Sequence, residues 1–314
     1  MIGKLLLDEI TERDSYSPSF LPDLKELEIS LKEVGLIYPL IVRKEKSKLQ
    51  LVCGLKRLMV LESLKVKEAK AEIFQEDELS PKEAIKIAVG HNLSRMNLIE
   101  KAKAVEKLLF YGISEEEIIG KWLPLLGMGP KREIYNTLIS LLRLPTRVLI
   151  YITKKDLKLS DASLFFLFSF NELETLIPFL ESLMPSTSHL KEILLSFRDL
   201  TLKEKIPLND LLTQIGPILQ NLGSPKEKLE ALKNWLKRNR FPHLYQLESS
   251  FQNLIKNLNL SSLLAYPPTF ENEEFLLTLK FKNKKELLSL IKKLNRVVKE
   301  LKTVPYDPFE ISNY

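Results

Sequence analysis

The sequence predicts an α+β protein that is mostly helical. Three observations predict this class: short strand patterns alternate with helical patterns in residues 1–97, helical spacing runs through residues 98–223, and residues 224–302 mix helices with a further strand pattern. We therefore expect a small α/β N-terminal domain, an all-helical middle domain, a basic α+β C-terminal module and a tail at 303–314.

Composition limits the class of protein. The chain has 314 residues, of which 45% are apolar and 28% charged, so it can bury a core in two or three domains. No apolar run approaches the roughly 18 residues of a membrane helix, and the first residues lack the pattern of a signal peptide. We expect a cytoplasmic protein without membrane contact.

Cysteine and histidine are scarce. Cys53 is the single cysteine, which excludes an intrachain disulfide framework. The three histidines, His91, His189 and His243, lie far apart and have no cysteine partners at zinc-ligand spacing. We expect no structural metal.

The charge is unevenly distributed. The net charge is +6 and the pI is about 9.0. Residues 225–302 hold 16 Lys/Arg against 8 Asp/Glu, whereas residues 1–224 sum to zero. A nucleic-acid partner is one interpretation of this basic balance, and a solvated lysine-rich surface is the other.

In the first region the elements are expected in a fixed order. Leucines at helical spacing predict a helix from residue 24 that stops at Gly35, and two strands follow within 39–53 around a charged hairpin. A helix over 55–64 and a strand over 71–76 come next. Ser80, Pro81 and Glu83 then start another helix with a capping box.

The turn between the second strand and the following helix carries a candidate site. Gly54 ends the apolar strand, and Lys56 and Arg57 open the helix. Backbone amides and the positive end of the helix dipole converge at such a turn, which favours a phosphate cradle. The alternative is an ordinary turn with solvated cations.

The middle region contains a helix-turn-helix pattern within residues 113–145. Its turn holds Gly127 and Gly129, and Pro130 is expected to start the second helix. The residues expected to be exposed at that end and to face DNA bases are Lys131, Arg132, Tyr135 and Asn136. The surrounding candidates for phosphate contact are Lys121, Arg143, Arg147, Lys154, Lys155 and Lys158. A helical hairpin without DNA binding is the alternative.

Capping boxes and an apolar stripe complete the local patterns. Capping boxes are expected at Ser114 to Glu117 and at Thr201 to Glu204. A capped helix is expected over 224–241, a strand over 275–281 and a final helix over 283–302. The final helix has an apolar stripe, which serves either as core or as a pairing surface for a second chain.

Taken in order, these segments resemble the ParB family of chromosome and plasmid partition proteins. Residues 24–64 are similar to the family's opening helix, its "GL-x-x-P-L-x-V-R" strand and its nucleotide-binding "G-x-R-R" turn. The stretch "HNLSRMNLIEKAKAVEKLL" is similar to its "E-N-x-x-R" motif and linker helix. The resemblance covers roughly residues 20–170 and implies a ParB/sulfiredoxin-like N-terminal domain followed by a KorB/ParB-type helix-turn-helix domain.

The resemblance also implies a function. ParB N-terminal domains bind CTP with Mg²⁺; by resemblance Gly54 admits the triphosphate, Lys56, Arg57 and Arg95 contact phosphates, and Asn92 holds the metal. Double-stranded DNA, a second copy of the chain and a ParA-type ATPase are the implied partners, with a nucleoid-associated location. Nucleotide binding would close two N-terminal domains into a clamp around DNA, in chromosome or plasmid partition or related DNA organisation.

Several residues depart from the family pattern. His91 stands where the family has a glutamate, so hydrolysis of CTP stays open. Lys56 replaces the first arginine of the pair and loses its planar fork, and Tyr38 stands where many relatives have glutamine. Extra residues lie between the two helices of the helix-turn-helix, so the DNA site need not be the usual palindrome.

Two other functions remain open. One is a DNA-binding regulator on the same fold with a degenerate nucleotide site, which His91 and Lys56 favour. The other is a phosphotransferase or nuclease, for which Glu62, Glu72 and Glu83 are available carboxylates outside any recognisable catalytic motif.

Overall fold

A computed structural model describes residues 2–93, 96–258, 260, 263–265 and 276–302. The described chain falls into two compact units, Met1–Leu194 and Leu195–Tyr314. None of the described helices combines the length and the hydrophobicity needed to cross a membrane. The predicted boundaries at 97 and 223 stay predictions, and Arg95 and the tail 303–314 lie outside the described residues.

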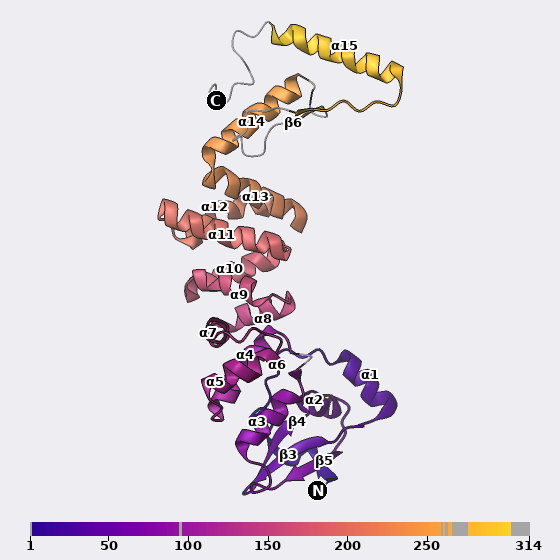
Figure 1. Ribbon diagram of the computed structural model, residues 1–314, viewed down its shortest axis with the longest axis vertical. Helices are drawn as coiled ribbons and strands as arrows, with labels where there is room; N and C mark the ends of the chain where they lie inside the picture. Colours follow the sequence, from indigo (N-terminus) through magenta and orange to yellow (C-terminus); the bar gives the residue numbers. More distant parts are fainter. Residues whose placement is uncertain (1, 94–95, 259, 261–262, 266–275, 303–314) are drawn as a thin grey trace. The chain divides into compact units, whose positions relative to one another are not determined.

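A mixed five-stranded sheet forms the base of the first unit (Figure 1). Its strands are β1 (Ile2–Leu6), β2 (Ile10–Glu12), β3 (Leu40–Glu45), β4 (Lys48–Cys53) and β5 (Glu68–Phe74). The 3-10 helix η1 (Leu7–Glu9) and the helices α1 (Lys25–Val34) and α2 (Leu55–Ser63) lie between them along the chain. The strand order is β1-β5-β3-β4-β2; β1/β5 and β3/β4 are antiparallel, and β3/β5 and β2/β4 are parallel. The predicted hairpin and the helices α1 and α2 are confirmed.

The two N-terminal strands were not predicted. The sequence of β1, IGKLL, shows no alternation of apolar and polar residues, and of its five residues only Leu5 is buried. The strand predicted at 71–76 begins earlier, at Glu68, because residues 68–72 pair with β1, with Glu68 opposite Leu6. Pairing across the sheet thus overrides a charged local sequence.

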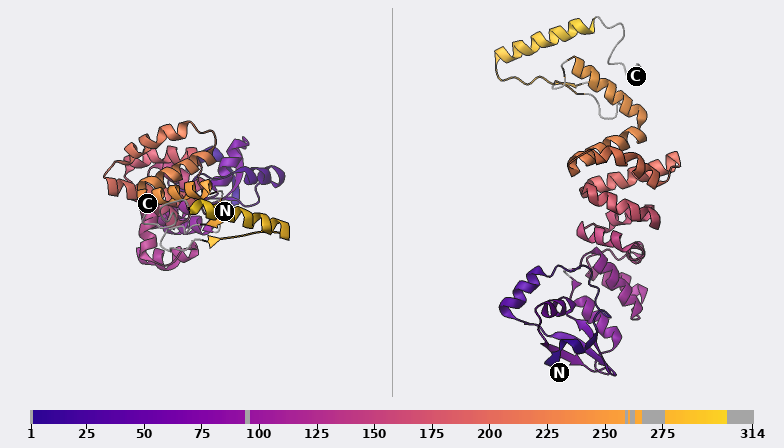
Figure 2. Two further views of the ribbon diagram at one scale, coloured as in Figure 1. Left: turned by 90° about the horizontal axis from the view of Figure 1, so that it is seen from above. Right: turned by 180° about the vertical axis from the view of Figure 1, so that it is seen from behind.

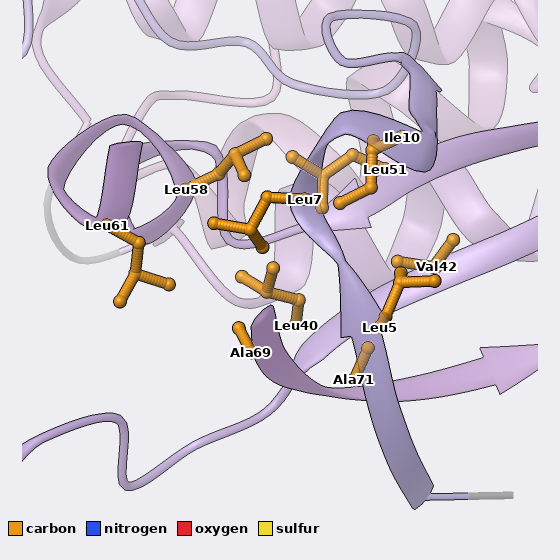
Figure 3. Packing of buried hydrophobic residues seen from close by; sticks show 10 residues of the cluster. All are labelled: Leu5, Leu7, Ile10, Leu40, Val42, Leu51, Leu58, Leu61, Ala69 and Ala71. Carbon is orange, nitrogen blue, oxygen red and sulfur yellow. The ribbon is translucent and has the colours of Figure 1, made fainter. Parts of the chain in front are cut away.

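The core of this domain lies between the sheet and α2. Figure 3 shows Leu58 and Leu61 of α2 facing Leu7 and Leu40. Alternate residues of each strand point to this side, among them Ala71, whose small side chain is fully buried. Packing of the helix on the sheet fixes the direction in which α2 leaves Gly54.

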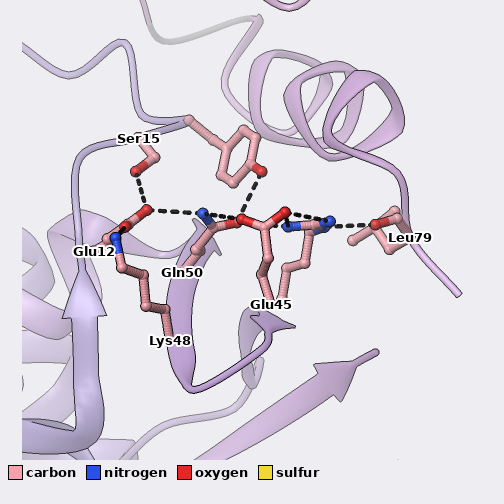
Figure 4. Close-up of polar contacts among 8 residues, drawn as sticks. Glu12, Ser15, Glu45, Lys48, Gln50 and Leu79 are labelled. Atoms are coloured by element: carbon pink, nitrogen blue, oxygen red, sulfur yellow. Dashed lines mark hydrogen bonds and ion pairs between the residues drawn. The ribbon is translucent and has the colours of Figure 1, made fainter. Parts of the chain in front are cut away.

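A polar network closes the other side of the hairpin (Figure 4). Tyr16 Oη donates to Gln50 Oε1 at 3.0 Å, and Arg43 Nη1 donates to the same oxygen at 2.8 Å. Arg43 Nε donates to Leu79 O at 2.7 Å. Glu12 accepts from Gln50 Nε2 at 2.8 Å. Buried Arg43 and Gln50 therefore have partners, as buried polar groups require.

The rest of the first unit is helical, as predicted. Its helices are α3 (Pro81–Gly90), α4 (Leu98–Phe110), α5 (Glu115–Glu117), the π-helical turn η3 (Ile118–Trp122), α6 (Leu123–Leu125), α7 (Arg132–Leu141), α8 (Thr146–Lys154), α9 (Leu159–Ala162), the 3-10 helix η4 (Ser163–Leu167), α10 (Phe170–Leu183) and α11 (Thr187–Glu204), which continues into the second unit. The right-hand view of Figure 2 shows the sheet and these helices from behind. α3 packs on β4 and on α4, and α4 packs on α7.

The predicted capping boxes had different outcomes. The box at Ser80 and Glu83 is confirmed. Ser114 accepts a hydrogen bond from the Glu117 amide at 3.2 Å, which is half of the predicted box. The box at Thr201 is wrong, because Thr201 lies inside α11 and its hydroxyl donates to Arg198 O at 2.8 Å. An already continuous helix leaves the Thr201 side chain no free amide to cap.

The second unit consists mainly of helices. Its elements are α12 (Leu208–Gln220), α13 (Pro225–Arg240), α14 (Pro242–Asn257), β6 (Leu264–Ala265), β7 (Leu276–Leu277) and α15 (Lys284–Leu301). The predicted strand over 275–281 is thus shortened to β7 among its described residues. In α15, Val297 packs in a small core cluster, whereas Ile291 and Val298 on the neighbouring edge of the stripe are exposed.

Candidate functional site

The turn between β4 and α2 has a backbone that only glycine adopts easily. Gly54 has φ +112°, in the left-handed region, and it caps α2. A Cβ at this position would lie 2.7 Å from Leu40 Cδ2 and 3.0 Å from Arg57 Nη2. Leu40 is fully buried and cannot withdraw. The glycine therefore permits a close approach of the turn to the core.

Arg57 holds the segment before β3 against this turn. Its Nη1 donates to Tyr38 O at 2.6 Å and to Pro39 O at 2.8 Å. Its Nη2 donates to Cys53 Sγ at 3.7 Å. Burial raises the pKa of the Cys53 thiol, although the neighbouring guanidinium opposes the shift. Cys53 is thus held as a thiol, and Arg57 has a structural role beside its predicted phosphate contact.

Lys56 points toward a buried carboxylate that the sequence analysis did not single out. Its Nζ lies 3.4 Å from Glu100 Oε1. Glu100 is the third residue of α4 and forms a capping box with Asn97. The pattern Asn97-Leu-Ile-Glu100 is a signal that would have identified this helix start, but nothing in the sequence indicates its proximity to Lys56.

The segment 14–20 is fastened along α4. The contacts are Lys107 Nζ to Asp14 O at 2.5 Å and to Ser15 O at 2.8 Å, Tyr111 Oη to Ser15 O at 3.2 Å, Lys103 Nζ to Ser19 O at 3.2 Å, and Asn97 Nδ2 to Phe20 O at 3.2 Å. Glu100 adds to them by accepting from the Phe20 amide at 3.2 Å. This fastened segment supplies one wall of the cavity described next.

The end of α3 brings in two more predicted residues. His91 is the C-terminal cap of α3 and is exposed. Asn92 follows it, and its Nδ2 donates to Ala88 O at 2.8 Å, which leaves the side-chain oxygen as its remaining polar atom.

These elements enclose a cavity of about 680 Å³. Gly54, Lys56, Arg57, His91 and Asn92 all line it, so five of the predicted site residues come together. Its other lining residues include Ser17, Pro18, Ser19, Leu27, Tyr38, Pro39, Ile41, Leu51, Val52, Cys53, Leu55, Glu72, Ala88, Met96 and Glu100. Loops, strands and the helices α1, α2, α3 and α4, which lie far apart in the sequence, thus form a single pocket.

The pocket fits a nucleotide in size and in chemistry. Ligand cavities of about 300–1,000 Å³ with apolar walls and a few polar groups are typical of cofactor sites. Here Lys56 and Arg57 supply cations at a glycine turn, and Met96 and Leu27 supply apolar wall.

No group of three His, Cys, Asp or Glu side chains suited to a metal occurs within the described residues. A Mg²⁺ ion bound together with phosphates needs few protein ligands, and the Asn92 oxygen would be one of them.

The carboxylates considered for an enzyme have different locations. Glu72 on β5 lines the cavity. Glu62 pairs with Arg13 at 2.7 Å, and Glu83 caps α3 through Ser80. Glu62 and Glu83 are not among the residues that line the pocket.

The predicted helix-turn-helix lies further along the first unit. Its first helix runs through α5, η3 and α6 and ends in a Schellman turn, in which Gly127 N donates to Pro124 O and Met128 N donates to Leu123 O, both at 2.9 Å. Gly127 has φ +72°. The second helix, α7, begins at Arg132, so the prediction that Pro130 starts it is wrong.

The candidate DNA contacts differ in exposure. Lys131, Asn136 and Arg143 are exposed. Arg132 is exposed too and pairs with Glu115 at 2.8 Å. Tyr135 is only 4% exposed and its hydroxyl donates to Glu115 Oε1 at 3.4 Å, so the expectation that it would be exposed is wrong. Tyr135 sits on the inner face of α7, beside the buried Leu138 and Leu141.

The outer ring of predicted phosphate contacts is also mixed. Lys121, Lys154 and Lys158 are exposed. Arg147 pairs with Glu181 at 2.5 Å, and Lys155 Nζ donates to Pro185 O at 3.0 Å. These two cations have partners within the chain that DNA phosphates would have to displace.

The first region of the chain is similar to known proteins. Residues 5–93 match the family model of the ParB N-terminal domain. These residues are similar to a ParB N-terminal domain. The chain is 31% identical over 128 residues to the chromosome-partitioning protein Spo0J of Thermus thermophilus, covering 40% of this chain and 44% of that protein.

The second relative is a probable chromosome 1-partitioning protein ParB from Deinococcus radiodurans, 29% identical over 153 residues, with 47% of this chain and 50% of the relative covered. The ParB-like chain thus spans about half the length of the curated relatives it matches.

Solved ParB structures were also found. A C-terminally truncated ParB of Caulobacter crescentus complexed with CTP-γ-S has 19% identity and a TM-score of 0.27, covering 56% of this chain and 98% of that one. The same protein complexed to the centromeric parS site has 17% identity and a TM-score of 0.34, covering 60% and 97%. A Pnob8-like ParB-N domain has 17% identity and a TM-score of 0.35, covering 62% and 88%.

Proposed function

We propose that this ParB-like chain is a DNA-binding partition protein whose N-terminal pocket takes CTP with Mg²⁺ and whose helix-turn-helix binds double-stranded DNA. One observation carries the nucleotide site: Gly54, Lys56, Arg57, His91 and Asn92, from separate parts of the sequence, line one cavity of about 680 Å³. The match of residues 5–93 to the ParB N-terminal domain supports the same conclusion.

In this proposal the chain's own residues bind and orient the nucleotide. Gly54 leaves room at the turn, Lys56 meets the phosphate chain, and Arg57 contacts it from the N-terminal end of α2, where the helix dipole also favours anions. Asn92 presents its oxygen to the metal. The nucleotide would act as a switch that closes two N-terminal domains around DNA, because it binds the closed state more tightly.

The partners and location follow from this function. The chain acts as a homodimer in the cytoplasm, on the nucleoid, in chromosome or plasmid partition, with a ParA-type ATPase as the partner of the complex. Surface Lys131, Asn136 and Arg143 are the supported DNA contacts, because all three are exposed on or beside α7.

Calorimetric titration tests the nucleotide site. The purified chain is titrated with CTP and with ATP, each with Mg²⁺, beside Arg57→Ala. We expect CTP binding in the natural protein and at least a tenfold loss in the variant, because a charge-assisted pair contributes about 1.5–3 kcal/mol. Absence of CTP binding by the folded natural protein, together with DNA retention that ignores CTP, would contradict the proposal.

The Arg57 variant needs its own control, because Arg57 also holds the Tyr38 and Pro39 carbonyls. A thermal melt of Arg57→Ala shows whether the domain is folded. Lys56→Gln, which leaves those carbonyl contacts in place, provides a second variant in which CTP affinity is expected to fall.

A second candidate function is a DNA-binding regulator with a degenerate nucleotide site. The specific observation that favours it is Arg57 Nη1, which is already occupied by two backbone carbonyls. His91 at the position of the family's glutamate points the same way. Sequence-specific DNA binding that responds to no nucleotide is the result expected of this candidate.

A further inference from the structure

Glu100 is a buried carboxylate in the wall of the nucleotide pocket. Its side chain is 4% exposed, and it accepts hydrogen bonds from the Asn97 amide at 3.1 Å, the Phe20 amide at 3.2 Å and the Ser19 hydroxyl at 3.4 Å. Lys56 Nζ, 3.4 Å away, is its cationic partner. Two of these contacts are to groups that line the pocket, Ser19 and Lys56.

The charged groups of the pocket balance. Among its described lining residues the cations are Lys56 and Arg57, and the carboxylates are Glu72 and Glu100. Arg57 Nη1 is committed to Tyr38 and Pro39. Lys56, whose side chain is 32% exposed, is therefore the cation best able to turn toward an anion in the cavity.

We infer that Glu100 is a positioning residue that sets the affinity of the pocket for polyanions by holding Lys56. This inference rests on the proposed nucleotide site. A phosphate chain that draws Lys56 toward itself leaves a buried carboxylate without its cation, and an uncompensated buried charge is strongly unfavourable. A ligand with more negative charges offsets this loss better than one with fewer. The pocket is thereby selective for a triphosphate tail over a monophosphate.

Glu100→Gln removes the negative charge of this side chain and nearly preserves its shape. Glutamine also serves at this position of a capping box, but its one side-chain oxygen replaces either Oε2, which accepts from the Asn97 amide at 3.1 Å, or Oε1, which accepts from the Phe20 amide at 3.2 Å. The substitution removes the pairing with Lys56 together with one of these two hydrogen bonds. We expect CTP to bind about fivefold more tightly, the effect of releasing one partly exposed ion pair, with a larger gain for CMP because the charge that disfavours the weaker anion is gone.

A double-mutant cycle provides the readout that a purely structural role would not give. In the Lys56→Gln background, Glu100→Gln is expected to leave CTP affinity unchanged, because no cation remains to be released. Glu83→Gln is the matched control: Glu83 occupies the same capping-box position in α3 but does not line the pocket, so CTP affinity should stay constant. Inorganic tripolyphosphate without divalent cation is titrated as a second ligand, and thermal melts check folding.

The outcomes separate this inference from the proposed function. If the natural protein binds CTP and Glu100→Gln weakens binding, leaves it unchanged, or tightens it equally without Lys56, the inference is overturned and the proposed function stands. If only Glu100→Gln binds CTP, the inference is supported. If neither protein binds CTP or tripolyphosphate, the proposed function fails and the inference fails with it.

Discussion

At the scale of single residues, Gly54 and Arg57 show how one turn combines a structural and a candidate binding role. The φ of +112° and the 2.7 Å approach to Leu40 require glycine for packing alone. Arg57 closes the turn through the carbonyls of Tyr38 and Pro39. A glycine and a basic residue at the start of a helix can serve packing alone. They form a phosphate-binding turn only if a cationic side chain there is still accessible to a ligand.

Tyr16 gives a prediction about pH. Burial, with a contribution from the neighbouring Tyr111, raises the pKa of Tyr16 to about 12 from its usual 10.0. Because the folded state binds this proton more tightly than the unfolded state, its contribution is complete below pH 10 and is lost as the pH rises from 10 to about 12. We expect the free energy of unfolding to fall over this alkaline range.

Tyr16→Phe tests this assignment. At neutral pH the variant should be about 1 kcal/mol less stable, because the hydrogen bond to Gln50 is lost while Gln50 keeps its bond from Arg43. Urea titrations at neutral and alkaline pH should show the gap between the two proteins narrowing above pH 10. Tyr151, whose pKa burial also raises to about 12, contributes equally in both proteins. A constant gap would contradict the prediction.

At the scale of elements, helix ends carry most of the local information in this sequence. Complete capping boxes start α3, α4, α10 and α13. Thr201 matches the pattern as well but lies within α11. The capping-box pattern predicts a helix start only where an extended residue precedes the helix, because only the first amides of a helix lack a hydrogen-bond partner within it.

The Schellman turn of the helix-turn-helix gives the second prediction. Gly127→Ala places a side chain at φ +72°, and we expect the free energy of unfolding to fall by about 1–2 kcal/mol. Gly127→Asn should recover part of the loss, because asparagine tolerates this region. Urea denaturation followed by circular dichroism measures both.

Gly120→Ala is the matched control for this turn. Gly120 lies in η3, its φ is not in the left-handed region, and a Cβ there would meet no atom within 4 Å. Its substitution should leave stability unchanged or slightly higher. Equal losses at Gly120 and Gly127 would show that backbone strain at the turn is not the cause.

At the scale of the whole molecule, charge on the helix-turn-helix should determine how DNA binding depends on salt. Affinity for DNA falls as salt rises, and each phosphate contact makes the slope of log affinity against log salt more negative by about 0.9. Lys131→Ala and Arg143→Ala should therefore each weaken binding and make the slope shallower by about one. Fluorescence anisotropy with duplex DNA over a series of salt concentrations measures this.

Lys48→Ala controls for net charge, because Lys48 lies on the sheet and pairs with Glu12 at 2.7 Å. It removes the same charge, yet its slope should match that of the natural protein. A similar change in all three variants would mean that overall charge rather than a defined interface governs binding.

The sequence by itself determined most of the elements. The hairpin of β3 and β4, the helices α1, α2 and α3, the amphipathic α15 and the residues Gly54, Lys56 and Arg57 follow from periodicity, capping and turn chemistry, which act over a few residues. It missed β1 and β2, whose short edge segments lack such a pattern.

Only the tertiary structure decided which side chains meet. Glu100 accepts a hydrogen bond from the amide of Phe20, 80 residues away in the sequence, and pairs with Lys56, 44 residues away. The burial of Tyr135 depends on how α7 packs against α4, not on its position at the start of the helix. Such contacts arise when whole helices and strands pack together. They bring together side chains whose proximity no local sequence pattern can indicate.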